Sequence, residues 1–194
     1  MKLNSLTIEN FRSFQGSHSI NLQTKKNLPI VMFAGLNGAG KTSILTAIKL
    51  GLFGKASLKG HITNKTYSSY MQEQINKDSL NVNFASVSID FDYLKRGKNY
   101  HYLVDRSWKV IQNKLTESLV IYENNEVISG LNLDQAQSFI FDLIPLGVAD
   151  LFFFDGEMVG DMANDQDGKT LIDALKKLVG ADLIEKAASD TAVV

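Results

Sequence analysis

The sequence predicts an α/β fold in which a mixed β-sheet containing an antiparallel meander is flanked by helices. The first observation is a continuous apolar run that leads directly into a glycine-rich loop, after which apolar residues recur at helical spacing. The second is a succession of β-prone runs with alternating side chains across the middle of the chain. The third is the return of amphipathic stripes toward the C-terminus, which predicts helices after the meander.

The first part of the chain is expected to supply three strands and a helix. Near-alternation of apolar residues at 3–8 and at 18–22 predicts two strands joined by a turn. The run at 29–35, PIVMFAG, is continuously apolar and rich in β-formers, which is typical of a strand buried on both faces. Apolar residues at helical spacing from 44 to 53 predict a helix that ends at Gly54.

The middle of the chain is expected to form the antiparallel meander. Residues 55–79 are polar and are expected to make a surface excursion with one short helix near 70–75. The runs at 82–93 and 100–110 alternate, and Gly97 between them allows a hairpin turn. The later elements follow in order: a strand at 118–122, a turn at Asn124 and Asn125, a strand at 126–128, a helix at 134–143 before Pro145, a short strand or buried turn at 151–154, and a helix at 171–178.

Length, composition and charge exclude several classes of protein. The 194 residues make one ordinary domain, and 44% hydrophobic with 21% charged residues is typical of a globular protein. A formal net charge of −1 provides no overall positive field, so any contact with DNA would need a local patch. The absence of cysteine excludes disulfides and thiolate chemistry. No apolar run is as long as a membrane span and the N-terminus alternates like a strand, so we expect a cytoplasmic protein with no membrane partner.

The segment Gly35 to Thr42, GLNGAGKT, carries the strongest functional signal in the chain. It matches the phosphate-loop pattern of two glycines five positions apart, followed by lysine and a hydroxyl residue. Glycine lets successive backbone amides turn inward around phosphates, and the following helix directs its positive end toward them. The sequence therefore predicts a nucleotide site formed by Asn37, Gly38, Ala39, Gly40, Lys41, Thr42 and Ser43.

Individual roles in this loop follow from the chemistry of its side chains. Lys41 is expected to reach the β and γ phosphates, and Thr42 to place its hydroxyl on Mg²⁺. Ser43 and the loop amides are expected to contact phosphate oxygens. A chance match is a weak alternative, because the expected strand precedes the loop and the expected helix follows it.

Two candidates outside the loop have alternatives that the residues leave open. The apolar run at 151–154 ends in Asp155, which is typical of a strand whose acid holds Mg²⁺, with Glu157 orienting water; the alternative is a simple turn at Asp155-Gly156. Arg12 lies between two aromatic residues and offers a fork suited to phosphate, or it is a solvated turn residue. A basic run that could touch DNA or nucleotide, or be only solvated, comprises Lys55, Lys59, His61 and Lys65.

Three segments together resemble a known group of proteins. They are LTIENFRSFQG at 6–16, AGLNGAGKTSILTAIKLGLFG at 34–54 and LFFFDGE at 151–157. They resemble the N-terminal part of SMC-type and RecF-type ATPases, which are ABC-like heads that act on DNA. Within that group the chain is most similar to the DndD family, the ATPases of DNA sulfur modification (phosphorothioation).

The resemblance implies a fold, a cofactor and roles for single residues. It implies the N-terminal lobe of an ABC-type P-loop NTPase at 1–180, followed at 181–194 by the start of a coiled-coil helix or a truncated tail. It implies ATP and Mg²⁺, and it implies that Arg12 approaches the nucleotide. Asp155 stands where the metal-sensing loop of the family usually presents glutamine, so it could hold Mg²⁺ but not donate a hydrogen bond to water.

The same resemblance implies partners. The expected partners are the protein's own C-terminal lobe, a second copy in an ATP-dependent homodimer, DNA, and other DNA-modification proteins. The chain has no LSGGQ-like signature and no strand ending in adjacent Asp and Glu, so we expect it to hydrolyse ATP weakly or not at all alone. The alternatives are a related DNA repair or phage-defence ATPase, a P-loop small-molecule kinase, and a non-catalytic nucleotide-dependent module.

Overall fold

A computed structural model of the chain describes residues 1–58, 62–79, 82–95, 97–112 and 114–146. The chain divides into two compact units, Met1–Phe139 and Ile140–Val194. The first unit contains every described strand and helix except the end of the last helix. The expected helix at 171–178 and the expected boundary at residue 180 lie outside the described residues.

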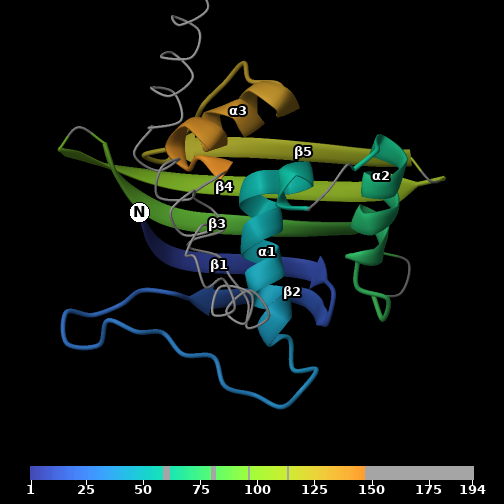
Figure 1. Cartoon of the computed structure of the whole chain (residues 1–194), viewed down its shortest axis with the longest axis horizontal. Helices are drawn as coiled ribbons and strands as arrows, with labels where there is room; N and C mark the ends of the chain where they lie inside the picture. Colours follow the sequence, from blue (N-terminus) through green and yellow to red (C-terminus); the bar gives the residue numbers. More distant parts are fainter. Residues whose placement is uncertain (59–61, 80–81, 96, 113, 147–194) are drawn as a thin grey trace, which may run out of the picture. The chain divides into compact units, whose positions relative to one another are not determined.

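The first unit is built on one six-stranded sheet with the order β2-β1-β3-β4-β5-β6 (Figure 1). Every strand pair in the described sheet is antiparallel. Strands β3, β4, β5 and β6 follow one another as consecutive hairpins, which confirms the meander. Strand β1 lies between β2 and β3 and pairs with both. The strands are β1 (Lys2–Phe11), β2 (Phe14–Asn21), β3 (Phe84–Lys95), β4 (Lys98–Ile111), β5 (Lys114–Glu123) and β6 (Glu126–Val127).

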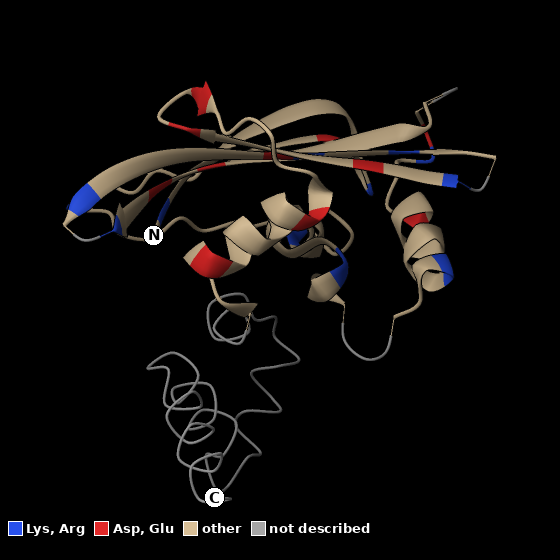
Figure 2. Ribbon diagram, turned by 90° about the horizontal axis from the view of Figure 1, so that it is seen from above, with Lys and Arg blue, Asp and Glu red and all other residues tan. Residues whose placement is uncertain are grey.

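The helices of this unit lie on one face of the sheet (Figure 2). The α1 helix contacts β1, β3 and β4, and α2 contacts β4 and β5. The elements are α1 (Lys41–Phe53), the 3-10 turn η1 (Gly54–Ser57), α2 (Asn64–Glu73) and α3 (Leu133–Leu143). The fold class expected from the sequence, an α/β lobe with a phosphate loop, a meander and flanking helices, is confirmed.

Alternation along the strands explains why the helices gather on one face. In β3, the side chains of Val87, Ile89 and Phe91 are fully buried, whereas the residues between them are half-buried and polar. Glycine and asparagine make the turns as expected: Gly97 has φ 77°, and Asn124 and Asn125 have φ 51° and 69°. The hairpins therefore keep the apolar side chains of each strand on the face of the sheet that the helices cover.

A buried arginine interrupts the apolar phase of this face. Arg106 of β4 pairs with Val87 on one side and Leu119 on the other, and it is 1% exposed. Its Nε donates to the carbonyl of Gly51 at 3.0 Å, and its guanidinium also binds the carboxylate of Glu117. A buried charge is tolerated only when it is paired and hydrogen-bonded, and Arg106 meets both conditions.

The structure corrects the prediction of a strand at 29–35. These residues form no regular strand, and several apolar side chains nearby are solvent-exposed: Leu28 by 66%, Ile30 by 81%, Met32 by 83% and Leu36 by 85%. A strand buried on both faces needs a hydrogen-bonded neighbour on each edge, and the described sheet offers none to this segment. The parallel component that it would add to the sheet is therefore absent from the described residues.

The structure also corrects the prediction that residues 55–79 are only a surface excursion. The helix here begins at Asn64, earlier than the expected 70–75, with the Thr63 side chain as its N-cap. Tyr67 and Met71 are buried, and Trp108 of β4 donates its indole N–H to the Met71 carbonyl at 2.9 Å. The segment is thus a packed part of the lobe. Its few buried side chains and its hydrogen bond to Trp108 hold it against the sheet although most of its residues are polar.

We predict that Gly54→Ala destabilises the lobe more than Gly130→Ala. Both glycines have positive φ, 51° and 82°, so alanine is strained at either position, at a cost of about 1 kcal/mol. A Cβ at Gly54 would also lie 2.6 Å from Arg106 Nη1, whereas at Gly130 no atom lies within 4 Å. We expect a loss of about 3 kcal/mol for Gly54→Ala, measured by urea unfolding. Equal losses of unfolding free energy in the two variants would contradict the conclusion that Arg106 is fixed in position.

Candidate functional site

The phosphate loop has the backbone that its glycines were predicted to provide. Gly38 and Gly40 have φ 85° and 92°, a region that other residues rarely adopt. A Cβ at Gly40 would lie 2.9 Å from Ser13 Oγ and 3.1 Å from the Phe14 ring. The turn between β1 and β2 therefore packs directly against the last glycine of the loop, which sequence reasoning did not foresee.

The side chain of Lys41 folds back over this loop. Its Nζ donates to the carbonyls of Gly35 at 2.7 Å and Leu36 at 2.8 Å. Carbonyl oxygens are weaker partners for an ammonium group than phosphate oxygens, since charge-assisted pairs are the stronger ones. The lysine is thus held beside the loop, where an incoming phosphate can replace the two carbonyls.

The N-terminal end of α1 supplies the second requirement of an anion site. Gly40 is the N-cap, no side chain caps the helix, and the first turn contains no acidic residue. The first amides of the helix therefore keep their partial positive charge for a ligand. Thr42 is exposed at this end, and its carbonyl accepts a hydrogen bond from Thr46 at 2.9 Å.

Arg12 is brought to the same end of α1. Its Nη1 donates to the Thr46 hydroxyl at 3.1 Å, and its Nε donates to Gln74 Oε1 at 2.6 Å. Arg12 has φ 50°, and its backbone is held by Gln74 and Asn76. The guanidinium therefore lies one helical turn from Thr42 and is not a freely solvated turn residue.

Two of these contacts could not be found from the sequence. Thr46 and Gln74 carry no motif, and they reach Arg12 only because α1 and the end of α2 meet the β1–β2 turn. Burial of Tyr70 raises the pKa of its hydroxyl, and the nearby Arg12 charge partly opposes this shift. Lys55 of the basic run donates to Asn64 at 2.9 Å and so serves the fold.

Four of the predicted site residues lie outside the described residues. These are Asp155 and Glu157 of the expected metal and water site, and Lys59 and His61 of the basic run. Within the described part of the chain, no group of three or more His, Asp or Glu side chains could hold a metal ion. Among the predicted metal ligands, Thr42 alone can therefore be placed.

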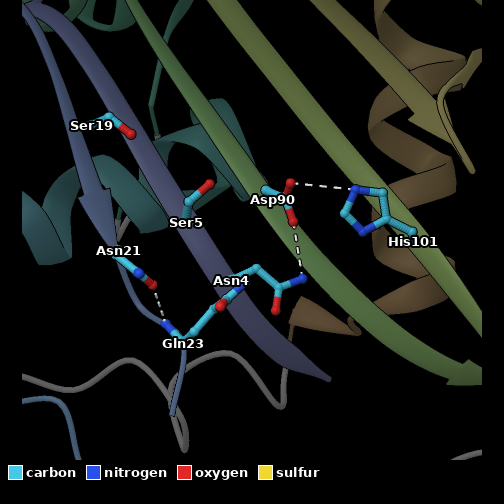
Figure 3. Close-up of a pocket in the computed structure, with 7 residues that line it drawn as sticks. All are labelled: Asn4, Ser5, Ser19, Asn21, Gln23, Asp90 and His101. Atoms are coloured by element: carbon cyan, nitrogen blue, oxygen red, sulfur yellow. Dashed lines mark hydrogen bonds and ion pairs between the residues drawn. The ribbon is translucent and has the colours of Figure 1, made fainter. Parts of the chain in front are cut away.

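A polar pocket on the opposite face of the sheet offers different chemistry (Figure 3). His101 lies between two carboxylates of β3, with its Nε2 3.3 Å from Asp90 and its Nδ1 3.2 Å from Asp92. The hydrogen bond from His101 holds the pKa of the Asp92 carboxyl below its ordinary value. No lysine or arginine lines the pocket, so it does not suit phosphate; its lining is Asn4, Ser5, Ser19, Asn21, Gln23, Asp90 and His101.

The chain is similar to several known proteins. The AAA domain family (AAA_23) matches residues 5–188. The DNA replication and repair protein RecF of Rickettsia prowazekii (strain Madrid E) is 31% identical over 117 residues, which cover 59% of this chain and 30% of that protein. RecF of Rickettsia typhi (strain ATCC VR-144 / Wilmington) is 32% identical over 118 residues, with the same coverage. The aligned part is thus under a third of either relative.

Structure comparison finds the SMC head domain from Thermotoga maritima, with a TM-score of 0.38 and 17% identity. The match covers 72% of this chain and 42% of that one. Among the helices that the structure describes, none has the length and apolar character needed to cross a membrane.

We predict that Asp92→Asn weakens the fold in a pH-dependent way. The folded-state pKa of Asp92 is lower than its ordinary value of 3.8, so the carboxylate stabilises the fold above that value and this contribution is lost as the pH falls through the lowered pKa. The urea midpoint of the variant should lie slightly below that of wild type at neutral pH, since the Asp92 side chain is 45% exposed and solvent screens its charge. The two midpoints should converge at a pH below both values.

The matched control for this experiment is Asp78→Asn. Asp78 is exposed in a turn after α2 and its carboxylate is far from His101 along the sequence. A convergence of the same size in both variants would show that general acid unfolding, and not the His101 contact, sets the pH dependence.

Proposed function

Because the chain belongs to the AAA domain family, we propose that it binds ATP with Mg²⁺ through the loop at Gly35–Thr42 and acts as the nucleotide-binding half of an SMC/RecF-like ATPase. One observation carries the proposal. The loop glycines, the Lys41 ammonium and the uncapped end of α1 form a cradle for phosphate, and Arg12 lies beside it.

The residues of this cradle fit the phosphates of a nucleotide. Lys41 would exchange the carbonyls of Gly35 and Leu36 for phosphate oxygens, and the first amides of α1 would donate hydrogen bonds to the negatively charged phosphate. Arg12 could turn its guanidinium to a phosphate only by giving up part of its contact with Gln74 or Thr46. Mg²⁺, when bound, would neutralise charge between phosphates, with Thr42 as one ligand.

Hydrolysis by this ATPase would need groups from beyond the described lobe. We assign Asp155 to the metal and Glu157 to the orientation of water, because an apolar run ending in an acid is typical of a metal-binding strand and LFFFDGE resembles the corresponding segment of the DndD family. A second lobe would supply the signature and the neighbouring acid that this chain lacks. Isolated, the chain would therefore bind ATP but turn it over slowly.

The exposed apolar segment supports a partner lobe. Residues 29–34 run directly into the phosphate loop, expose apolar side chains, and pair with no strand of the described sheet. A segment of this kind gains backbone hydrogen bonds and buried apolar area when another strand pairs with it. The proposed occupant is a strand of the protein's own C-terminal lobe.

DNA is the proposed target of the assembled ATPase. The two RecF relatives are named as DNA replication and repair proteins. ATP would bring two heads together, and hydrolysis would separate them, which would change how DNA is held. Within this group, the segment LFFFDGE at 151–157 favours DNA sulfur modification, whereas the RecF relatives favour repair.

We predict that Lys41→Ala weakens ATP binding by this chain. Loss of charge-assisted hydrogen bonds to phosphate should weaken the affinity by about tenfold to a hundredfold, measured by titration with a fluorescent ATP analogue in the presence of Mg²⁺. Lys77→Ala is the matched control, because it removes an exposed lysine after α2. Equal affinity in wild type and Lys41→Ala would contradict the phosphate-loop assignment.

We also predict that ATP turnover depends on the C-terminal half of the full-length protein. Supplying that half in trans should raise turnover by the present chain and should make its association state, measured by light scattering, dependent on ATP. Substitution of Glu157 by Gln should then allow ATP-dependent association but slow turnover. Rapid turnover by the present chain alone would instead favour a self-sufficient site such as that of a small-molecule kinase.

A further inference from the structure

We propose that a buried network centred on Arg106 couples the phosphate-loop helix α1 to α2, so that α2 responds to nucleotide bound at the far end of α1. The network consists of Arg106, Glu117, Tyr67 and Gln137, none of which belongs to the phosphate loop. The inference rests on the proposed function, because it takes the N-terminal end of α1 as the nucleotide site.

The network holds the C-terminal end of α1. Arg106 Nε donates to the Gly51 carbonyl at 3.0 Å, and Gln137 Nε2 donates to the Leu52 carbonyl at 3.0 Å. Arg106 Nη2 in turn donates to Gln137 Oε1 at 2.5 Å. A cation at this end of a helix is favourable, since the last carbonyls carry partial negative charge. The helix that cradles phosphate with one end is therefore clamped at the other.

The same network reaches α2 through a single hydroxyl. Tyr67 of α2 donates its O–H to Glu117 Oε1 at 3.0 Å, and Glu117 is paired with Arg106. Burial raises the pKa of the Tyr67 hydroxyl, and the Glu117 charge raises it further, so the group stays a neutral donor. The guanidinium, the carboxylate and the hydroxyl thus form one continuous chain from α1 to α2.

A second contact links α2 to the nucleotide end of α1. Gln74 immediately follows α2, and its side-chain oxygen accepts from Arg12, which also donates to Thr46 of α1. The helix α2 is therefore tied to α1 toward both of its ends, once through Arg106 of β4 and once through Arg12 of the β1–β2 turn. A movement of Arg12 toward phosphate would change its contacts with Gln74 and Thr46, while the contacts of Arg106 would remain.

Stability alone is a poor explanation for the Arg106 network. Well-packed apolar residues often replace a buried ion pair without loss of stability, so such a pair is weak evidence for a stabilising role. Only Tyr67 and Met71 of α2 are buried, which leaves this helix dependent on its few polar ties. An element of low local stability held by directional contacts is suited to change position when those contacts change.

The absence of cysteine allows a direct test on the whole chain. Ser69→Cys places a single thiol on the exposed face of α2, where an environment-sensitive fluorophore can be attached. The response of this probe to ATP and Mg²⁺ is measured in four backgrounds: otherwise wild type, Lys41→Ala, Tyr67→Phe and Tyr122→Phe. Tyr122→Phe is the matched control, because it removes a hydroxyl from the other face of the sheet.

The expected result is a saturable probe response in the parent and in Tyr122→Phe, and a response reduced about fivefold or more in Tyr67→Phe that still binds ATP. A titration with the fluorescent ATP analogue separates the two hypotheses. Loss of analogue binding in the parent would overturn the proposed function. Bound ATP with no probe response in the parent, or with an equal response in Tyr67→Phe, would overturn the coupling. Glu117→Gln, which keeps an acceptor for Tyr67, should retain more of the response than Glu117→Ala.

Discussion

The burial of one guanidinium determines how this lobe is assembled. Arg106 occupies a position in β4 where alternation calls for an apolar side chain, and its charge must be satisfied from several elements at once. The partners come from the end of α1, from β5 and from the start of α3, so these elements can take only positions that complete its hydrogen bonds. Apolar burial drives the association of helices and sheet, but the hydrogen bonds of Arg106 specify where each element lies.

The phosphate loop depends on this arrangement although it lies at the other end of α1. A cradle for anions needs a helix whose axis is fixed, because its amides must point at the ligand before the ligand arrives. The sheet supplies the remaining part of the site through the turn between β1 and β2, which carries Arg12 and packs Ser13 against Gly40. Arg12 of the β1–β2 turn and Arg106 of β4 thus contact α1 toward its opposite ends.

Local features of the sequence predicted most of the fold. Alternation predicted the strands from 84 to 123, and glycine and asparagine predicted their turns, because side-chain period and backbone freedom are properties of neighbouring residues. The phosphate loop was equally clear, since its spacing is local. The run at 29–35 was wrongly predicted as a strand, because burial on both faces depends on partners elsewhere. The links of Arg106 to Glu117 and Gln137 were missed, since charge in a buried phase gives no indication of which distant groups satisfy it.

The uncovered segment before the phosphate loop also affects how this protein behaves in a crowded cell. Exposed apolar side chains on a segment that pairs with no strand of the described sheet favour association with other chains in β-conformation, including another copy of this chain. A lobe that exposes such a segment is expected to bind chaperones and to be prone to aggregation. Rapid pairing with the proposed partner lobe would therefore protect the chain from aggregation.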